Sequence, residues 1–126
     1  LRDTKFDTQY GNFTYDSRIH CAADYAMSYV AEYSPVTKQE IKESLVILIP
    51  NSTMYDGVTY MYGDGSALAL CPKSELDFPY DARGVIQHEA CGHGFTKLAD
   101  EYIYHRAWIQ TCKCTCCAHV ADLQGM

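Results

Sequence analysis

The sequence predicts an α/β (α+β) fold in which helices pack on a sheet. Three observations predict it: a helical repeat over residues 17–33, an aliphatic run at 45–49, and two strand-like runs joined by a glycine turn before another helix. Helix, strand, hairpin and helix in this order are typical of layered domains. The chain has 126 residues, of which 48% are hydrophobic and 21% charged, so we expect a single globular domain over 1–126.

The N-terminal third predicts a loop followed by an amphipathic helix. Residues 1–19 are polar and aromatic and include Gly11 and Asn12, which favours a loop with one short strand. Over residues 17–33, apolar side chains recur three and four positions apart, as they do on one face of a helix: Ala22, Tyr25, Ala26, Tyr29, Val30 and Tyr33. Ser34 and Pro35 are expected to end this helix, because the residue before a proline avoids helical geometry.

The middle of the chain predicts a short helical turn and three strands. Thr37 and Glu40 have the spacing of a capping box, which marks the start of a helix. The aliphatic run at 45–49 is typical of a strand that is buried on both faces. Residues 58–62 and 66–71 flank Gly63-Asp64-Gly65, and this arrangement predicts a hairpin that could form the rim of a cleft.

A helix that begins near Asp81 carries the candidate chemistry, in the segment QHEACGHGFTKLADEY. A catalytic zinc ion needs about three protein ligands and one open position, and His88 and His93 are suitable ligands. Glu89, next to the first histidine, can take a proton from water at the metal and pass it to the leaving amine. This combination predicts hydrolysis of peptide bonds, although lone histidines more often have a structural role.

The spacing of the two histidines predicts a distorted helix. In the usual zinc motif the histidines are four residues apart, so they lie about 40° apart around an α-helix. Here they are five apart, which corresponds to about 140° on a regular helix and is too far for one shared ion. A π-bulge absorbs one extra residue and restores a shared face. We therefore predict a π-type or otherwise broken turn between His88 and His93, with the distortion at Gly92.

The third metal ligand is expected downstream, after a glycine that can end the helix. Gly94 is the glycine in question, and after such a turn the chain can return toward the metal. Asp100 is the first choice for the third ligand. Glu101 is the alternative, or a solvated carboxylate or partner of a histidine, and His105 is a possible substitute ligand.

The stretch HEACGHGFTKLADEY resembles the IgA-peptidase family of bacterial zinc metallopeptidases, and the resemblance extends more weakly over residues 4–105. It implies a metzincin-like zincin catalytic domain, with a twisted mixed sheet, a backing helix, an active-site helix and a substrate cleft. It also implies that His88, His93 and Asp100 bind zinc and that Glu89 is catalytic. No suitable methionine turn precedes Met126, so we expect a partial domain that lacks the lower subdomain.

Seven cysteines indicate an oxidising environment or a metal site. Four of them form a cysteine-rich segment at 112–117: Cys112, Cys114, Cys116 and Cys117. Disulfides, with Cys71 or Cys21 as partners, are the simpler interpretation for a secreted, cell-surface or periplasmic protein. A thiolate metal site that uses Cys114 and Cys117 is the alternative. Cys91, inside the histidine motif, is expected to be a small packed residue.

Charge and hydropathy limit the expected partners. The net charge is −6 and no basic stripe is present, which argues against nucleic acid. No apolar run reaches the roughly 20 residues of a transmembrane helix. The expected partner is a protein or peptide substrate, which could pair with the edge of the hairpin. The alternative hypothesis is a non-catalytic metal-binding or adhesive secreted domain, and a redox-active thiol protein ranks third.

Overall fold

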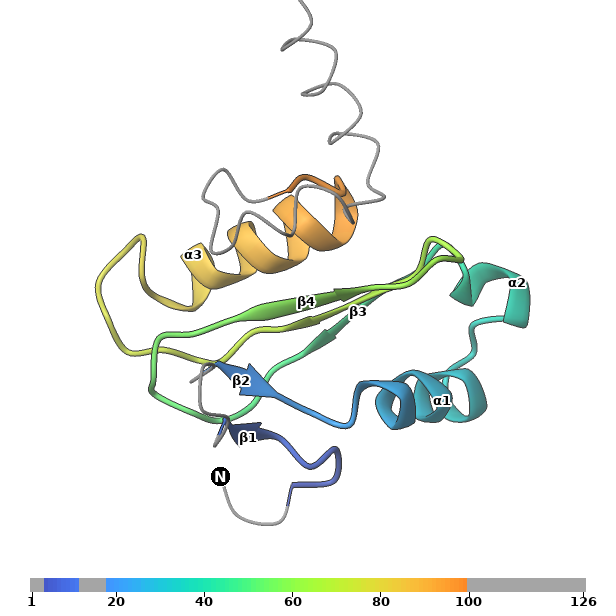
Figure 1. The fold of residues 1–126 in the computed structure, drawn as a ribbon, viewed down its shortest axis with the longest axis horizontal. Coiled ribbons are helices and arrows are strands. Elements are labelled where there is room, and N and C mark those ends of the chain that lie inside the picture. Colours follow the sequence, from blue (N-terminus) through green and yellow to red (C-terminus); the bar gives the residue numbers. More distant parts are fainter. Residues whose placement is uncertain (1–3, 12–17, 100–126) are drawn as a thin grey trace, which may run out of the picture.

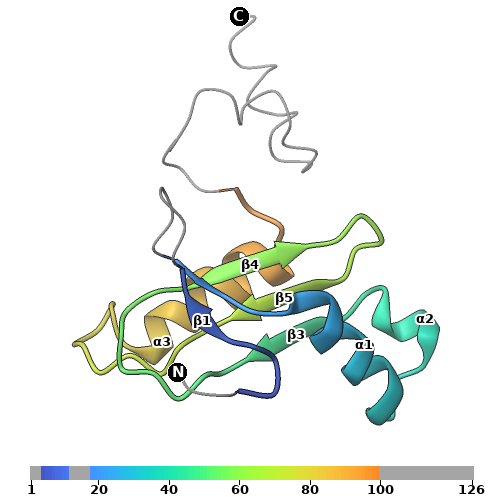
Figure 2. The same ribbon diagram turned by 60° about the horizontal axis from the view of Figure 1, so that its bottom comes forward.

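A computed structural model of the chain describes residues 4–11 and 18–99 (Figure 1). In this part of the chain, a three-stranded mixed sheet lies between two layers (Figures 1 and 2). A long helical segment covers one face, and a second helix with a two-stranded ribbon covers the other. The prediction of a mixed α/β architecture is confirmed, whereas the metzincin-like arrangement stays a prediction.

The N-terminal layer consists of a small ribbon and the helix α1. Strands β1 (Gln9–Tyr10) and β2 (Ile19–His20) pair antiparallel, and α1 extends over Ala23–Tyr33. The helix begins later than predicted because Ile19 is already part of the ribbon. The amide of Ile19 donates to Asp56 Oδ2 at 2.6 Å, and the Ile19 side chain is buried. The end of the helix at Ser34 agrees with the prediction.

The capping box at Thr37 is formed as predicted and begins the short helix α2 (Lys38–Ile41). The hydroxyl of Thr37 accepts a hydrogen bond from the Glu40 amide at 3.3 Å, and Glu40 Oε2 accepts one from the Thr37 amide at 2.8 Å. Each side chain thus satisfies a backbone amide at the start of the helix that has no partner within the helix.

The central sheet contains β3 (Leu45–Leu48), β4 (Val58–Met61) and β5 (Ala67–Leu70) in the order β3-β5-β4. Strands β4 and β5 form the predicted antiparallel hairpin, while β3 is parallel to β5. Gly65 in the turn has φ of +96°, a conformation that favours glycine. Asp64 Oδ1 supports the turn by accepting from the amide and the hydroxyl of Ser66.

The expectation that residues 45–49 are buried on both faces is wrong. Ile47 is 43% exposed and Ile49 is 62% exposed, because β3 is at the edge of the described sheet. The central strand is β5, where every residue is buried. Its alternating side chains serve both layers, since Leu68 packs with the α1 layer and Ala69 with the opposite helix.

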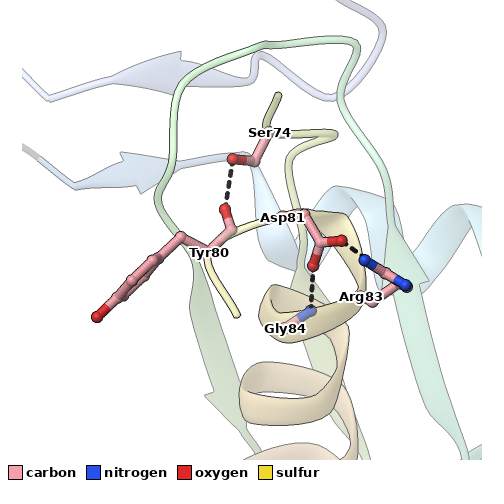
Figure 3. Close-up of polar contacts among 5 residues, drawn as sticks. All are labelled: Ser74, Tyr80, Asp81, Arg83 and Gly84. Atoms are coloured by element: carbon pink, nitrogen blue, oxygen red, sulfur yellow. Dashed lines mark hydrogen bonds and ion pairs between the residues drawn. The ribbon is translucent and has the colours of Figure 1, made fainter. Parts of the chain in front are cut away.

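The helix that carries the histidines begins at Asp81, as predicted, with α3 (Ala82–Val85). Figure 3 shows the contacts that hold this start: Asp81 Oδ1 accepts from the Gly84 amide at 3.1 Å, and Asp81 Oδ2 accepts from Arg83 Nε at 2.6 Å. In the preceding loop, the Ser74 hydroxyl donates to the Tyr80 carbonyl at 2.7 Å. A side chain at Gly84 would have its Cβ 1.6 Å from the Pro79 oxygen, so the loop requires glycine there.

The segment η1 (Ile86–Phe95) continues α3 and lies mainly over β5 and β4. The prediction that Gly94 ends this helix is wrong. Gly94 is buried inside it, and a Cβ at this position would lie 2.5 Å from Leu45 Cδ1, so the glycine allows close packing on the sheet. The helix ends instead at Thr96, and Lys97 takes the left-handed conformation with φ of +59°. No helix among the described residues is long and apolar enough to span a membrane.

Candidate metal and catalytic site

The two histidines lie on a π-helix, which confirms the predicted distortion. All ten residues of η1 have this winding, in which hydrogen bonds join residues five apart, so His88 and His93 occupy adjacent turns on one face. The distortion is not confined to Gly92, contrary to expectation. A Cβ at Gly92 would make an ordinary contact of 3.5 Å with the Gln87 oxygen, so no steric constraint requires glycine at this position.

The imidazole nitrogens of His88 and His93 converge. Their Nε2 atoms are 3.2 Å apart, and the rings are nearly perpendicular, with centroids 4.7 Å apart and an interplanar angle of 87°. Two nitrogens that bind one tetrahedral zinc ion, each at about 2.0–2.1 Å, lie about 3.3–3.4 Å from each other. The observed separation therefore fits two ligands of a single ion. It also fits a direct hydrogen bond between the rings.

The hydrogen bond on the other side of the His93 ring determines its tautomer. Nδ1 of His93 lies 2.6 Å from the Leu98 carbonyl oxygen, which can only accept, so Nδ1 carries the proton. In the neutral ring, Nε2 then presents a lone pair. The chain after the helix is held in place by the Lys97 amide, which donates to the His93 oxygen, and the Leu98 amide, which donates to the Gly92 oxygen. Contacts of this kind orient histidine ligands in metal sites.

Glu89 lies on the sheet side of η1, where it contacts β4. Its exposed fraction is 9%, and its Oε2 accepts a hydrogen bond of 2.8 Å from the hydroxyl of Thr59. The same hydroxyl lies 2.8 Å from the backbone oxygen of Glu89. Gly57 also contacts this side chain closely, since a Cβ at Gly57 would lie 2.6 Å from Glu89 Cγ. Thr59 and Gly57 therefore fix the position of the carboxylate.

Sequence reasoning missed Thr59 as a site residue. The one available signal was a hydroxyl side chain within the otherwise apolar and aromatic segment VTYM, flanked by Val58 and Tyr60 on the opposite face. Gly57 lies within residues 4–105, over which the weaker resemblance to the IgA-peptidase family extends, but no role was predicted for it. Neither residue could be assigned to Glu89 from sequence, because β4 and η1 are 30 positions apart where they meet.

The described cysteines differ in environment. Cys71 is buried below η1, and its burial, with further contributions from Glu89 and Cys91, raises the pKa of its thiol to about 12. Cys91 is exposed, so the expectation that it is a packed residue is wrong. In residues 4–11 and 18–99, no disulfide joins Cys21, Cys71 and Cys91. The predicted cysteine-rich segment at 112–117 lies outside the described residues.

The predicted third ligand, Asp100, lies outside the described residues, as do Glu101 and His105. Within the described part of the chain, no three His, Cys, Asp or Glu side chains form a group that could hold a metal ion. The last described residues nevertheless pass beside the histidines, since the Leu98 carbonyl contacts His93 and Asp100 follows Leu98 by two positions.

A groove lies between β4 and the chain segment that leads into the first turn of α1. Its volume is about 760 Å³, within the range typical of ligand pockets. Two short segments line it: Cys21, Ala22, Ala23, Asp24 and Tyr25, and Thr59, Tyr60, Met61 and Tyr62. Asp24 is the only one of these lining residues with a formal charge at neutral pH.

Comparison of the chain with protein-family models, with curated proteins and with solved structures gives no match. The resemblance to the IgA-peptidase family therefore stays a prediction. The arrangement of His88, His93 and Glu89 is therefore the basis on which a function can be assigned.

Proposed function

We propose that this chain is a zinc-dependent metalloendopeptidase that acts outside the cytoplasm, with a metzincin-like catalytic domain. The observation that carries the proposal is the 3.2 Å separation of the Nε2 atoms of His88 and His93. A π-helix brings together two nitrogens whose spacing in the sequence would separate them on an α-helix. π-helical distortions occur frequently at functional sites, which supports a role beyond packing.

His88 and His93 would hold the zinc ion through Nε2, and Asp100 would complete the set, as the sequence predicts. The tautomer of His93 suits this role, because its Nδ1 proton is engaged by the Leu98 carbonyl. His88 is exposed, which suits a site that substrate must enter. When bound, zinc would supply a Lewis acid that polarises the peptide carbonyl and makes water more acidic.

Glu89 would act as the general base and then as the general acid. The hydroxyl of Thr59 donates to Oε2 at 2.8 Å, which helps to hold the carboxylate in place. The carboxylate would take a proton from the attacking water and then return it to the amine nitrogen of the leaving peptide. The close contact of Gly57 with Glu89 restricts the carboxylate to one position, which favours proton transfer along a fixed path.

The outer edge of β4, which pairs with no other strand in residues 4–11 and 18–99, supports a peptide substrate. The Tyr62 amide donates to the Ser66 carbonyl, so in the alternating antiparallel pattern Tyr60 bonds toward β5 while the backbone groups of Thr59 and Met61 point outward. An extended peptide can pair with such an edge through main-chain hydrogen bonds. Because Thr59 also contacts Glu89, a peptide paired here would lie beside the proposed base.

The test is to measure zinc content and hydrolysis of an unfolded protein by the purified full chain. We expect about one zinc ion per chain and hydrolysis that the isosteric variant Glu89→Gln lowers by about 10²- to 10⁴-fold while zinc is retained. His88→Ala and His93→Ala should lose zinc. Gln87→Ala, an exposed change on the same helix, is the matched control and should keep both properties.

The outcomes separate the proposal from its alternatives. Retained hydrolysis in Glu89→Gln would remove the mechanism. Zinc bound through the histidines without any hydrolysis by the wild-type chain would indicate the non-catalytic metal-binding domain instead. Absence of zinc from the wild-type chain would leave the contact between His88 and His93 as a hydrogen bond between two rings.

A further inference from the structure

We propose that the groove between β4 and α1 is a specificity subsite that binds a lysine or arginine side chain of the peptide substrate, with Asp24 as its charged partner. The inference rests on the proposed function and adds a substrate class to it. Four observations carry it: the contact of one groove residue, Thr59, with Glu89; an outer edge of β4 that pairs with no other strand among the described residues; the direction of alternate side chains; and the charge of the described lining residues.

The groove adjoins the proposed catalytic carboxylate through one residue. Thr59 donates to Glu89 on the η1 side of the sheet and also lines the groove. A substrate paired with β4 at Thr59 would therefore extend along the groove as well as past Glu89.

The alternation of side chains along a strand determines which substrate residue enters the groove. In β4, Tyr60 packs on the α1 side of the sheet, whereas Thr59 faces η1. Side chains that lie directly opposite each other in an antiparallel pair are on the same face. The substrate residue opposite Thr59 would thus face Glu89, and its neighbour opposite Tyr60 would face the groove. The subsite should select one residue at a fixed distance from the cleaved bond.

The groove walls suit a long side chain with a positive end. Ala22, Ala23 and Tyr60 provide apolar surface that can cover the methylene stem of lysine or arginine. Asp24 is the only residue with a formal charge among the described lining residues, and it is exposed on the first turn of α1. The Tyr62 hydroxyl lies 3.5 Å from Asp24 Oδ1, so an aromatic ring adjoins the carboxylate. Tyrosine rings also attract cations through their faces.

The charge of the chain agrees with a basic substrate. The net charge is −6, which favours encounter with positively charged peptides over acidic ones. Asp24 also has a structural role, because a carboxylate in the first turn of a helix stabilises the helix dipole. The experiment therefore has to separate selectivity from folding.

The test uses a mixture of peptides from a digested, denatured proteome, incubated with the full chain, with the cleaved bonds mapped by mass spectrometry. We expect lysine or arginine to be enriched at one position near the cleaved bond by about fivefold, the upper end for a partly exposed ion pair. Asp24→Asn should abolish the enrichment, and Asp24→Lys should replace it with enrichment of aspartate or glutamate. Glu32→Gln, an exposed change on α1 outside the groove, is the matched control.

The readouts distinguish this inference from the proposed function. Cleavage of many peptides without a basic preference, or a preference that survives Asp24→Asn, would overturn the subsite while the peptidase activity stands. Absence of any cleavage by the wild-type chain would overturn both. The melting temperatures of Asp24→Asn and Glu32→Gln should be compared to establish that both variants are folded. Unselective cleavage by a folded Asp24→Asn variant is the supporting result.

Discussion

The substitution Gly57→Ala tests whether the position of Glu89 matters for activity. The added Cβ would lie 2.6 Å from Glu89 Cγ and 2.8 Å from its Oε1. Carbon atoms in favourable contact are about 3.5–4.0 Å apart, so the Glu89 side chain has to move by about 1 Å. The three nearest atoms all belong to Glu89, so the carboxylate absorbs the change while the histidine rings keep their positions.

The expected loss follows from the contact that this displacement breaks. Moving the carboxylate by about 1 Å removes the 2.8 Å hydrogen bond from Thr59. A hydrogen bond to a charged group contributes about 1.5–3 kcal/mol. If the transition state loses this stabilisation, kcat/KM falls by about 10- to 150-fold, because 1.36 kcal/mol of activation free energy corresponds to a factor of about ten in rate.

The assay compares Gly57→Ala with Gly63→Ala in hydrolysis of an unfolded protein. Gly63 is in the hairpin turn, where a Cβ would meet nothing within 4 Å, so its variant should match the wild type. Both variants should retain zinc, which excludes loss of the metal as the cause of a reduced rate. An unchanged kcat/KM for Gly57→Ala would refute the view that Gly57 constrains the base.

Three further predictions concern stability and the same carboxylate. Gly84→Ala should lower the free energy of unfolding in urea by about 2–3 kcal/mol, because its methyl group would overlap the Pro79 oxygen; an unchanged midpoint would contradict this. Thr59→Val should lower kcat/KM at least about tenfold, while Thr59→Ser, which keeps the donor to Glu89, should stay close to the wild type. The pKa of the Cys71 thiol is about 12 in the folded chain, whereas an unfolded chain loses this proton from about pH 9. Between these values the unfolded state binds fewer protons than the folded state, so the free energy of unfolding falls as pH rises. Denaturation between pH 9 and 12 should show a weaker decline for Cys71→Ala; an identical decline would contradict the assignment.

The parts of the fold that depend on local rules could be predicted from sequence. The capping box at Thr37 and the start of α3 at Asp81 depend on side chains that accept hydrogen bonds from nearby backbone amides. The end of α1 at Ser34 depends on Pro35, which disfavours helical geometry at the residue before it. The π-helix was predicted for a different reason. We predicted it because His88 and His93 have to reach the same ion. The residues of η1 show no evident propensity for a π-helix.

The parts that depend on packing could not be predicted. An aliphatic run such as 45–49 can form either an edge strand or a central strand. The exposure of Ile47 depends on the strand order, which the sequence does not specify. Gly94 has the residue type of a helix end but serves close packing on Leu45. The contact between Thr59 and Glu89 joins two elements that are far apart in the sequence, and no periodic pattern of residues indicates that they meet.

The winding of η1 has a consequence for how such sites are recognised in other sequences. Two imidazoles four residues apart on an α-helix and two imidazoles five residues apart on a π-helix can present the same pair of nitrogen atoms. A search that demands one fixed interval between ligands therefore discards chains in which a single inserted residue has been absorbed by a wider turn. Allowing the interval to vary with helix type would retrieve them.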